Sequence, residues 1–153
     1  MPLVGPVPCG ARRRAVLVAA LLCGLGALAA TPPPGGAQPR PQVGTAIEPV
    51  MQQLEAFRRD DFDAAYGHAS AQIRQLFDRA SFERMVRGSY PEIARSAFAA
   101  LAETREAPDG SVYLRLVIRG ANGRSIDAVY EMVVEEGAWK INGVVARPSG
   151  GTA

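Results

Sequence analysis

Cysteine is almost absent from this chain of 153 residues. Its two cysteines, Cys9 and Cys23, both lie near the N-terminus. A disulfide framework, a cysteine nucleophile and a cysteine-based metal site are therefore excluded for the chain beyond residue 23. Histidine is scarcer still, because His68 is the one histidine of the chain. The nitrogen and sulfur ligands are therefore too few for a zinc site. The sequence predicts no bound metal.

The chain also lacks an excess of either charge once its first residues are set aside. It holds 17 Lys and Arg against 15 Asp and Glu, and Arg12, Arg13 and Arg14 account for the positive balance. Without those three, 14 basic residues face 15 acidic ones, a net charge of −1. A domain of that charge lacks the basic patch of a nucleic-acid or anionic-membrane partner. We expect neither partner.

Motifs that bind cofactors or carry out nucleophilic catalysis are missing as well. There is no Walker pattern, no G-x-G-x-x-G following a strand and no G-x-S-x-G elbow. Asp60, Asp61 and Asp63 lack the glycine and downstream glutamate of a calcium loop, and helix capping explains them. The sequence therefore predicts no catalytic set and no cofactor.

The first thirty residues have the pattern of an export signal. Arg12 to Arg14 supply a positive start, and residues 15–30 form a run of 16 apolar and small residues. Ala27-Leu28-Ala29 has the small-x-small form of a cleavage site. We predict that residues 1–30 are a Sec-type signal peptide and that the domain is periplasmic or secreted. The alternative is an uncleaved N-terminal membrane anchor, although the run is shorter than the ~20 residues that span a bilayer.

Residues 31–44 have little to bury. They contain five prolines and three glycines, a composition that favours a disordered tail. A single domain is then predicted over residues 45–148, with enough chain to form a core without metals or disulfides.

Helical periodicity dominates the first half of this domain. Ile47, Val50, Leu54 and Phe57 recur at helical spacing and form one apolar stripe, which extends to Met51. Cap residues precede each helical stretch: Thr45, then Asp60 or Asp61, then Ser70 after a break at Gly67, then Ser81. Leu76 is expected to face inward with Ile73 and Phe77. Three helices are predicted on these grounds: residues 45–60, 61–77 with the break, and 81–88.

After Ile93 the hydrophobic period changes from 3.6 to 2, which predicts strands. Short turns separate them, including Asn122-Gly123 and Glu136-Gly137. Short connections imply an antiparallel meander. The predicted strands are residues 96–106, 111–119, 125–135 and 138–145.

Two stretches resemble parts of the NTF2-like superfamily, whose members include nuclear transport factor 2, ketosteroid isomerase and SnoaL-type cyclases. Ala56 to Tyr66 resembles the opening of such domains, and Gly137 to Gly143 resembles their last strand. The chain more closely resembles the DUF4864 family of bacterial proteins. The pieces that carry this likeness are residues 47–69, Ile73 to Phe77, Phe82 to Val86, Tyr90-Pro91, Ala128, Tyr130 and Trp139 to Gly143.

The resemblance implies an α+β fold: an NTF2-like cone with three N-terminal helices packed on a curved antiparallel sheet of four strands. A cone of this kind encloses a pocket, which is the expected ligand site. The polar residues predicted to line it are Tyr66, His68, Tyr90 and Tyr130, with Asp127 as a further residue to inspect. Alternation places Asp127 on the sheet face opposite Tyr130, so the carboxylate and the phenol of an isomerase site should not converge.

The outer face of the sheet is the second candidate surface. Arg115 and Arg119 share one strand face near Arg124 and would suit an anionic ligand. The simpler interpretation is a solvated face on which these arginines pair with Glu131 and Glu135.

Three functions follow as hypotheses. The leading one is a non-enzymatic module that binds a small apolar ligand or a protein partner through the cone or the sheet face. The alternative is a pocket-based enzyme of isomerase, cyclase or hydrolase type. A third is an assembly protein whose partner covers an apolar patch at Val117, Val129 and Val133. The resemblance also implies a homodimer formed through the sheet.

Overall fold

The computed structural model describes residues 39–149. The predicted signal peptide and most of the predicted tail lie outside this range. Along the chain the elements are η1 (Val43–Thr45), α1 (Ile47–Arg58), α2 (Phe62–Gly67), α3 (Ala71–Leu76), α4 (Arg79–Ser89), α5 (Pro91–Ala94), β1 (Ser96–Glu106), β2 (Val112–Gly120), β3 (Ser125–Glu135) and β4 (Ala138–Pro148).

The strands form one antiparallel sheet in the order β1-β2-β3-β4, which confirms the predicted meander. The predicted bounds of β1 and β3 agree with the structure, whereas β4 runs three residues beyond its predicted end at Val145. The extension has a partner, because Arg147 pairs with Asp127 and Pro148 with Ile126. A proline is tolerated there because β4 is an edge strand.

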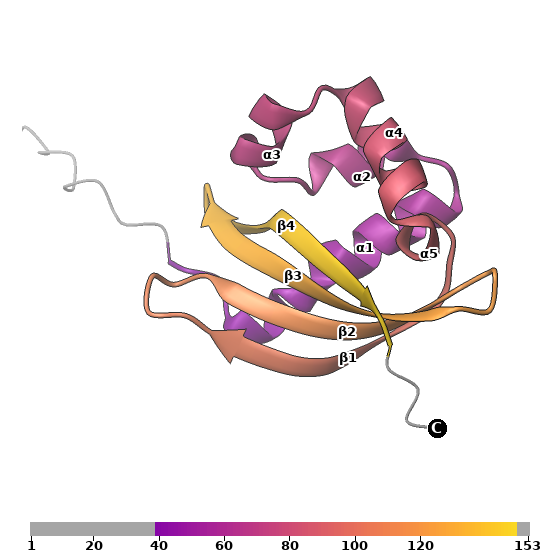
Figure 1. Cartoon of the computed structure of the whole chain (residues 1–153). Coiled ribbons are helices and arrows are strands. Elements are labelled where there is room, and N and C mark those ends of the chain that lie inside the picture. The colour runs from indigo at the N-terminus through magenta and orange to yellow at the C-terminus, as the bar shows by residue number, and fades with distance from the viewer. Residues whose placement is uncertain (1–38, 150–153) are drawn as a thin grey trace, which may run out of the picture. The chain divides into compact units, whose positions relative to one another are not determined.

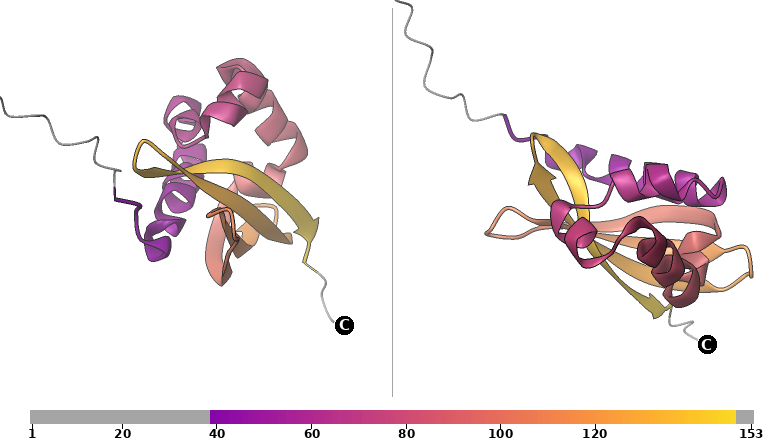
Figure 2. Two further views of the ribbon diagram at one scale, coloured as in Figure 1. Left: turned by 90° about the vertical axis from the view of Figure 1, so that its left-hand side faces the viewer. Right: turned by 90° about the horizontal axis from the view of Figure 1, so that it is seen from above.

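Helices cover one face of this sheet, as the α+β prediction requires. In Figure 1, α1 passes behind the strands and the shorter helices lie above β4; the turned views in Figure 2 show the bend of the sheet toward them. Alternate residues of β2 and β3 point into the space between, where Leu116, Ile118 and Ala128 are fully buried. The layers therefore form the cone-like arrangement that the resemblance implies.

The second predicted helix is two helices in the structure. Asp61 caps α2 through its carboxylate, which accepts a hydrogen bond from the Ala64 amide at 3.0 Å, and Ser70 caps α3 by accepting from the Ile73 amide at 3.2 Å. Between them, the Ser70 amide donates to the Ile141 carbonyl at 2.8 Å. The break at Gly67 thus lets the chain pair briefly with β4 before helix resumes.

Three local predictions are wrong. Asp78, not Ser81, caps α4, because its carboxylate accepts from the Ser81 amide at 2.6 Å. Thr45 does not cap α1, since its hydroxyl donates backward to the Gln42 carbonyl at 2.8 Å. Leu76 is 66% exposed at the end of α3, a helix with no buried residue, so helical spacing alone placed it inward incorrectly.

The boundary of the predicted tail also needs correction. The Trp139 indole donates a hydrogen bond to the Gln42 carbonyl at 3.0 Å, and the guanidinium of Arg40 stacks over the same indole at 5.5 Å. Val43 packs against the core. The buried Trp139 holds these residues, so the domain begins before residue 45.

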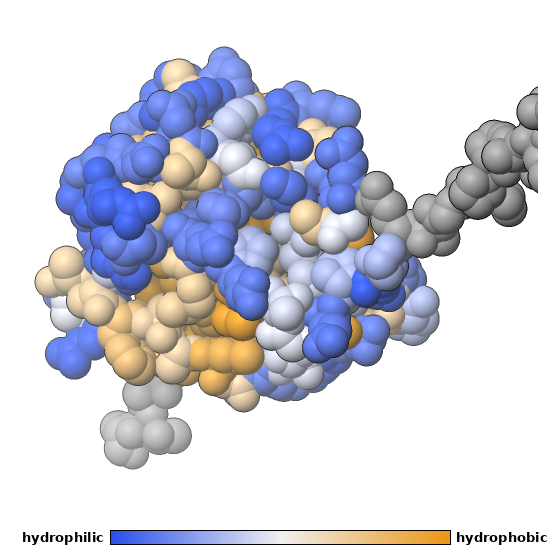
Figure 3. Space-filling model, turned by 180° about the vertical axis from the view of Figure 1, so that it is seen from behind, coloured by the Kyte–Doolittle hydropathy of each residue, from blue (hydrophilic) through white to orange (hydrophobic). Residues whose placement is uncertain are grey.

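The surface seen from behind is hydrophilic over most of its area, with a hydrophobic area at its lower edge (Figure 3). Within residues 39–149, no helix combines the length and the hydropathy needed to cross a bilayer.

Candidate functional site

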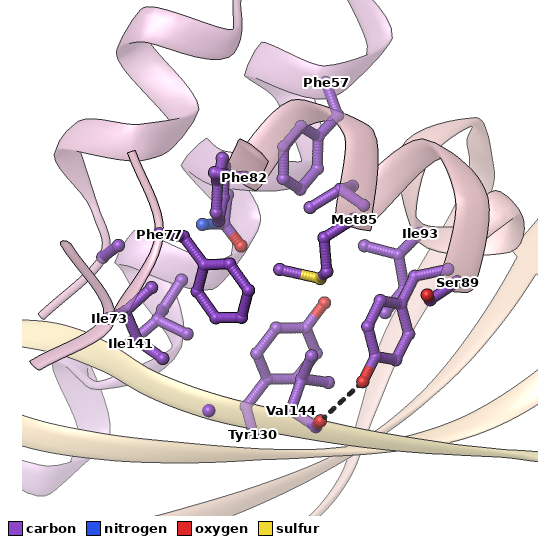
Figure 4. A pocket seen from close by; sticks show the side chains of 15 residues that line it. Phe57, Ile73, Phe77, Phe82, Met85, Ser89, Ile93, Tyr130, Ile141 and Val144 are labelled. Atoms are coloured by element: carbon purple, nitrogen blue, oxygen red, sulfur yellow. Dashed lines mark hydrogen bonds between the residues drawn. The ribbon is translucent and has the colours of Figure 1, made fainter. Parts of the chain in front are cut away.

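A cavity of about 280 Å³ lies between the helices and the inner face of the sheet (Figure 4). Most of its wall is hydrophobic, and the contributing elements are α1, α3, α4, α5, β3 and β4. Ile73, Phe77 and Met85 are half-buried, and Ser89 is exposed, so these residues form the outer rim. The lining residues are Gln53, Phe57, Ala69, Ile73, Phe77, Phe82, Met85, Val86, Ser89, Tyr90, Ile93, Tyr130, Ile141, Gly143 and Val144.

Tyr130 is the innermost polar residue of this cavity. Its side chain is 1% exposed, and its ring rises from β3 between Leu114 on β2 and Val144 on β4. Figure 4 shows the phenol oxygen directed toward Met85 across the cavity. Within the described part of the chain, this hydroxyl has no hydrogen-bond partner. Burial, and secondarily the neighbouring Tyr90, raise the pKa of Tyr130 well above its ordinary value, so the phenol stays protonated.

Two other polar groups of the wall have defined partners. The Tyr90 hydroxyl donates to the Val144 carbonyl at 3.3 Å, a contact drawn in Figure 4. The buried Gln53 carboxamide donates through Nε2 to the Ala65 carbonyl at 3.1 Å, which leaves its oxygen as an acceptor. These bonds fix both side chains in place. The Tyr130 hydroxyl is therefore the buried polar group of the wall that makes no hydrogen bond to residues 39–149.

Two of the four predicted pocket residues line the cavity and two lie outside it. Tyr90 and Tyr130 line the cavity. Tyr66 does not, because its ring packs on Phe82 at 5.3 Å and its hydroxyl donates to the Phe77 carbonyl at 2.7 Å. Tyr66 therefore packs against Phe82, which itself lines the cavity.

His68 also lies outside the cavity. It is half-buried at the end of α2, and its carbonyl accepts a hydrogen bond from the Ile141 amide at 2.9 Å. Burial lowers the pKa of His68, and the positive charge of Lys140 adds to that effect. His68 borders shallow hollows of the surface instead, together with Met51, Gln52 and Lys140.

Sequence reasoning missed most of the wall. The sequence signal for Gln53 is its helical spacing, three residues after Val50 and four before Phe57, and the structure buries it to 4% exposure. Ile73 and Phe77 were predicted to face inward, but periodicity does not distinguish a side chain that fills the core from one that borders an empty space. No group of three or more potential metal ligands occurs within residues 39–149.

The outer face of the sheet differs from its predicted pairing. Arg115 bridges Glu103 on β1 at 3.3 Å and Asp127 on β3 at 3.2 Å, not Glu131 and Glu135. The register explains the difference. Glu103 lies directly opposite Arg115, and Asp127 lies opposite Val117, the next outward-facing residue of β2 after Arg115. Glu135 instead accepts from the Ala71 amide at 2.9 Å, at the start of α3. As predicted, Asp127 lies on the face opposite Tyr130.

Comparison with known families then identifies the domain. A family model described as "Domain of unknown function (DUF4864)" matches residues 41–153. This chain belongs to the DUF4864 family. The match starts at Pro41, which agrees with a domain that begins before residue 45. No curated protein matches the chain.

Among solved structures, the DUF4864 chain is similar to Aln2 from a Streptomyces species, with 16% identity, a TM-score of 0.48, and coverage of 72% of this chain and 93% of Aln2. It is also similar to a SEC-C motif-containing protein from Rhodopseudomonas palustris, with 18% identity, a TM-score of 0.44, and coverage of 69% and 88% of the two chains. Likenesses this distant carry no argument about function.

Proposed function

We propose that this DUF4864 domain binds a small hydrophobic molecule in the cavity beneath α3 and α4. The observation that carries the proposal is the wall itself, which combines a largely apolar lining with a few fixed polar groups. That combination is typical of small-molecule sites. An apolar cavity of about 150 Å³ holds benzene, so the 280 Å³ here suits a molecule of about two to three rings.

The composition of the wall favours binding over catalysis. Among the lining residues there is no carboxylate, histidine, lysine or arginine, and its ionisable groups are Tyr90 and Tyr130. General acid–base chemistry at neutral pH depends on groups whose pKa lies near the working pH, and the pKa of Tyr130 is shifted in the opposite direction. A pocket-based isomerase, cyclase or hydrolase is therefore the weaker of the two hypotheses.

Filling the cavity tests the proposal. We expect wild-type protein to bind the neutral fluorescent probe N-phenyl-1-naphthylamine saturably, with enhanced emission. Ile73→Trp should weaken that binding by about tenfold or more, because the indole of a half-buried rim residue would occupy the space the probe needs.

Gln72→Trp is the matched control for this measurement. Gln72 precedes Ile73 on α3 and is exposed, so this variant adds the same indole outside the cavity and should bind the probe like wild type. Absence of saturable binding by wild type, or equal binding by Ile73→Trp, would count against the cavity as a ligand site.

We also propose that the outer sheet face pairs with a second copy of the chain. Phe98 is 58% exposed, Val129 36% and Val145 59%, and Val129 and Val145 are directly opposed on β3 and β4. Ala100 and Val117, opposed on β1 and β2, lie on the same face. The nearby charges offset one another, because Arg115 pairs with Glu103 and Asp127, and Arg105 also pairs with Glu103. The Arg115–Asp127 ion pair lies between Val117 and Val129, so the apolar side chains form two groups, one on β1 and β2 and one on β3 and β4. Exposed apolar side chains gathered on one face are a common mark of an interface.

Light scattering across a concentration series checks the dimer. Wild type should approach twice the monomer mass, and Val145→Asp should remain a monomer because it would bury a carboxylate in the interface. Leu76→Asp is the control, since Leu76 is similarly exposed, at 66%, but lies on α3. A wild-type monomer at every concentration would refute the pairing.

We further propose that the domain works outside the cytoplasm. The support is the signal-like pattern of residues 1–30. The mass of the protein recovered from its native cells tests this. Cleavage after Ala27-Leu28-Ala29 would lower the mass by that of the signal peptide, which contains both cysteines. A full-length mass would favour the membrane-anchor alternative.

A further inference from the structure

The chemistry of the ligand can be narrowed by a polar group at the heart of the cavity. The Tyr130 hydroxyl is fully buried, is directed toward the side chain of Met85 in the cavity wall, and has no acceptor within residues 39–149, so a bound molecule reaches it when the flexible Met85 side chain shifts. A buried O–H without a partner costs free energy, and buried polar groups in folded proteins are rarely left in that condition. Since the phenol stays protonated, the missing partner is a hydrogen-bond acceptor.

The rest of the wall limits what can carry that acceptor. No cationic side chain lines the cavity, so a carboxylate or phosphate would be buried there without a counter-charge, at a large desolvation cost. Around Tyr130 the wall is formed by the apolar side chains of Phe77, Met85, Ile93 and Val144, with Tyr90 nearby (Figure 4). A molecule that fits this wall has an apolar body and is uncharged at the end that reaches Tyr130.

From these observations we infer that the ligand is a neutral hydrophobic carbonyl compound whose oxygen accepts a hydrogen bond from Tyr130. A carbonyl oxygen satisfies the phenol and brings no hydrogen that would need an acceptor beside the apolar side chains of Met85, Ile93 and Val144. The role assigned to Tyr130 is recognition: the cavity wall has no carboxylate or histidine with which it could exchange a proton. This inference rests on the proposed function and specifies the ligand class for the same cavity.

Three probes of nearly equal shape separate the possibilities, each competing with N-phenyl-1-naphthylamine on the full-length protein. They are 2-acetylnaphthalene, a neutral ketone; 2-isopropenylnaphthalene, in which a CH₂ group replaces the carbonyl oxygen; and 2-naphthoate, which is charged. Wild type should bind the ketone about tenfold more tightly than the hydrocarbon, as one buried hydrogen bond allows, and should bind the naphthoate most weakly.

Tyr130→Phe removes the donor and keeps the ring. In this variant the ketone should lose its advantage while the affinity of the hydrocarbon stays unchanged, which also shows that the variant is folded. An independent readout is the infrared carbonyl stretch of the bound ketone, which should move to lower frequency in wild type and return in the variant.

The outcomes distinguish the two proposals. If ketone and hydrocarbon bind wild type equally well, or if the carbonyl stretch does not move, the inference about Tyr130 is overturned while the cavity remains a binding site. If the naphthoate binds best, the ligand is an anion and the inference is likewise overturned. If neither the three probes nor N-phenyl-1-naphthylamine binds, both the proposed binding function and the inference about Tyr130 are refuted.

Discussion

Replacing Phe62 by alanine is expected to lower the free energy of unfolding by about 3–5 kcal/mol, the usual cost of removing a fully buried aromatic ring. Phe62 opens α2 and is 1% exposed. Its ring lies 5.3 Å from that of Phe57, and the guanidiniums of Arg87 and Arg79 approach it at 4.4 and 5.5 Å. Alanine would leave a void between α1 and α2 and remove the surface on which both arginines lie.

This loss is large relative to the stability of the whole domain. A domain of this length has a total stability of about 5–15 kcal/mol, so the variant should be close to its unfolding transition at moderate temperature. Equilibrium urea unfolding followed by far-ultraviolet circular dichroism measures it.

Phe98→Ala is the control, because it makes the same chemical change at a ring that is 58% exposed on β1. Its effect on the isolated monomer should be within about 0.5 kcal/mol of wild type. A loss at Phe62 no larger than at Phe98 would mean that the ring does not contribute to the core as the structure shows.

Strands could be predicted closely from the sequence because both signals for them are local. In β3, Ile126, Ala128, Tyr130 and Met132 alternate with polar or exposed residues, and glycine-containing turns mark both ends. Gly123 and Gly137 adopt positive φ angles of 80° and 76°, the conformation that the turn composition predicted. Alternation also placed Asp127 correctly on the outer face.

Helix ends were less predictable because several residues in a row can serve as caps. Asp78 and Ser81 are both good cap residues, and the choice between them depends on where α4 must begin to place Phe82 and Val86 in the core. Leu76 shows the same limit, since it remains exposed at the end of the short helix α3. These outcomes depend on tertiary packing, which one sequence does not display.

Two of the four predicted residues line the candidate site, and the other two do not, for a similar reason. Alternation placed Tyr130 on the inner face of the sheet, and Tyr90 was named as a polar residue of the expected pocket, but Tyr66, named on the same ground, meets Phe82 and the Phe77 carbonyl instead of the cavity. Which inward residues border a space follows from the angle between helices and sheet. That angle results from contacts far apart in the sequence.

Tyr130→Phe is expected to raise the free energy of unfolding of the ligand-free domain by about 1–3 kcal/mol. The substitution removes a hydroxyl that is buried without a partner among the described residues, and keeps the ring that packs on its neighbours. Urea unfolding of both proteins without added ligand measures the difference.

Tyr66→Phe is the matched control, and it should have the opposite sign. The Tyr66 hydroxyl donates to the Phe77 carbonyl at 2.7 Å, so its removal should lower stability by about 0.5–1.5 kcal/mol. A Tyr130→Phe variant that is less stable than wild type would mean that the hydroxyl is already satisfied in the free protein, and the case for an acceptor on the ligand would fall.

The two outcomes at Tyr130 are linked. A hydroxyl that destabilises the free domain yet improves the binding of a carbonyl compound is a site where recognition is favoured over stability. A ligand that binds more tightly stabilises the folded state more. The melting temperature of wild type should therefore rise more with 2-acetylnaphthalene than that of Tyr130→Phe, although the ligand-free variant has the higher melting temperature. Equal shifts in the two proteins would show that the bound oxygen and the Tyr130 hydroxyl do not meet.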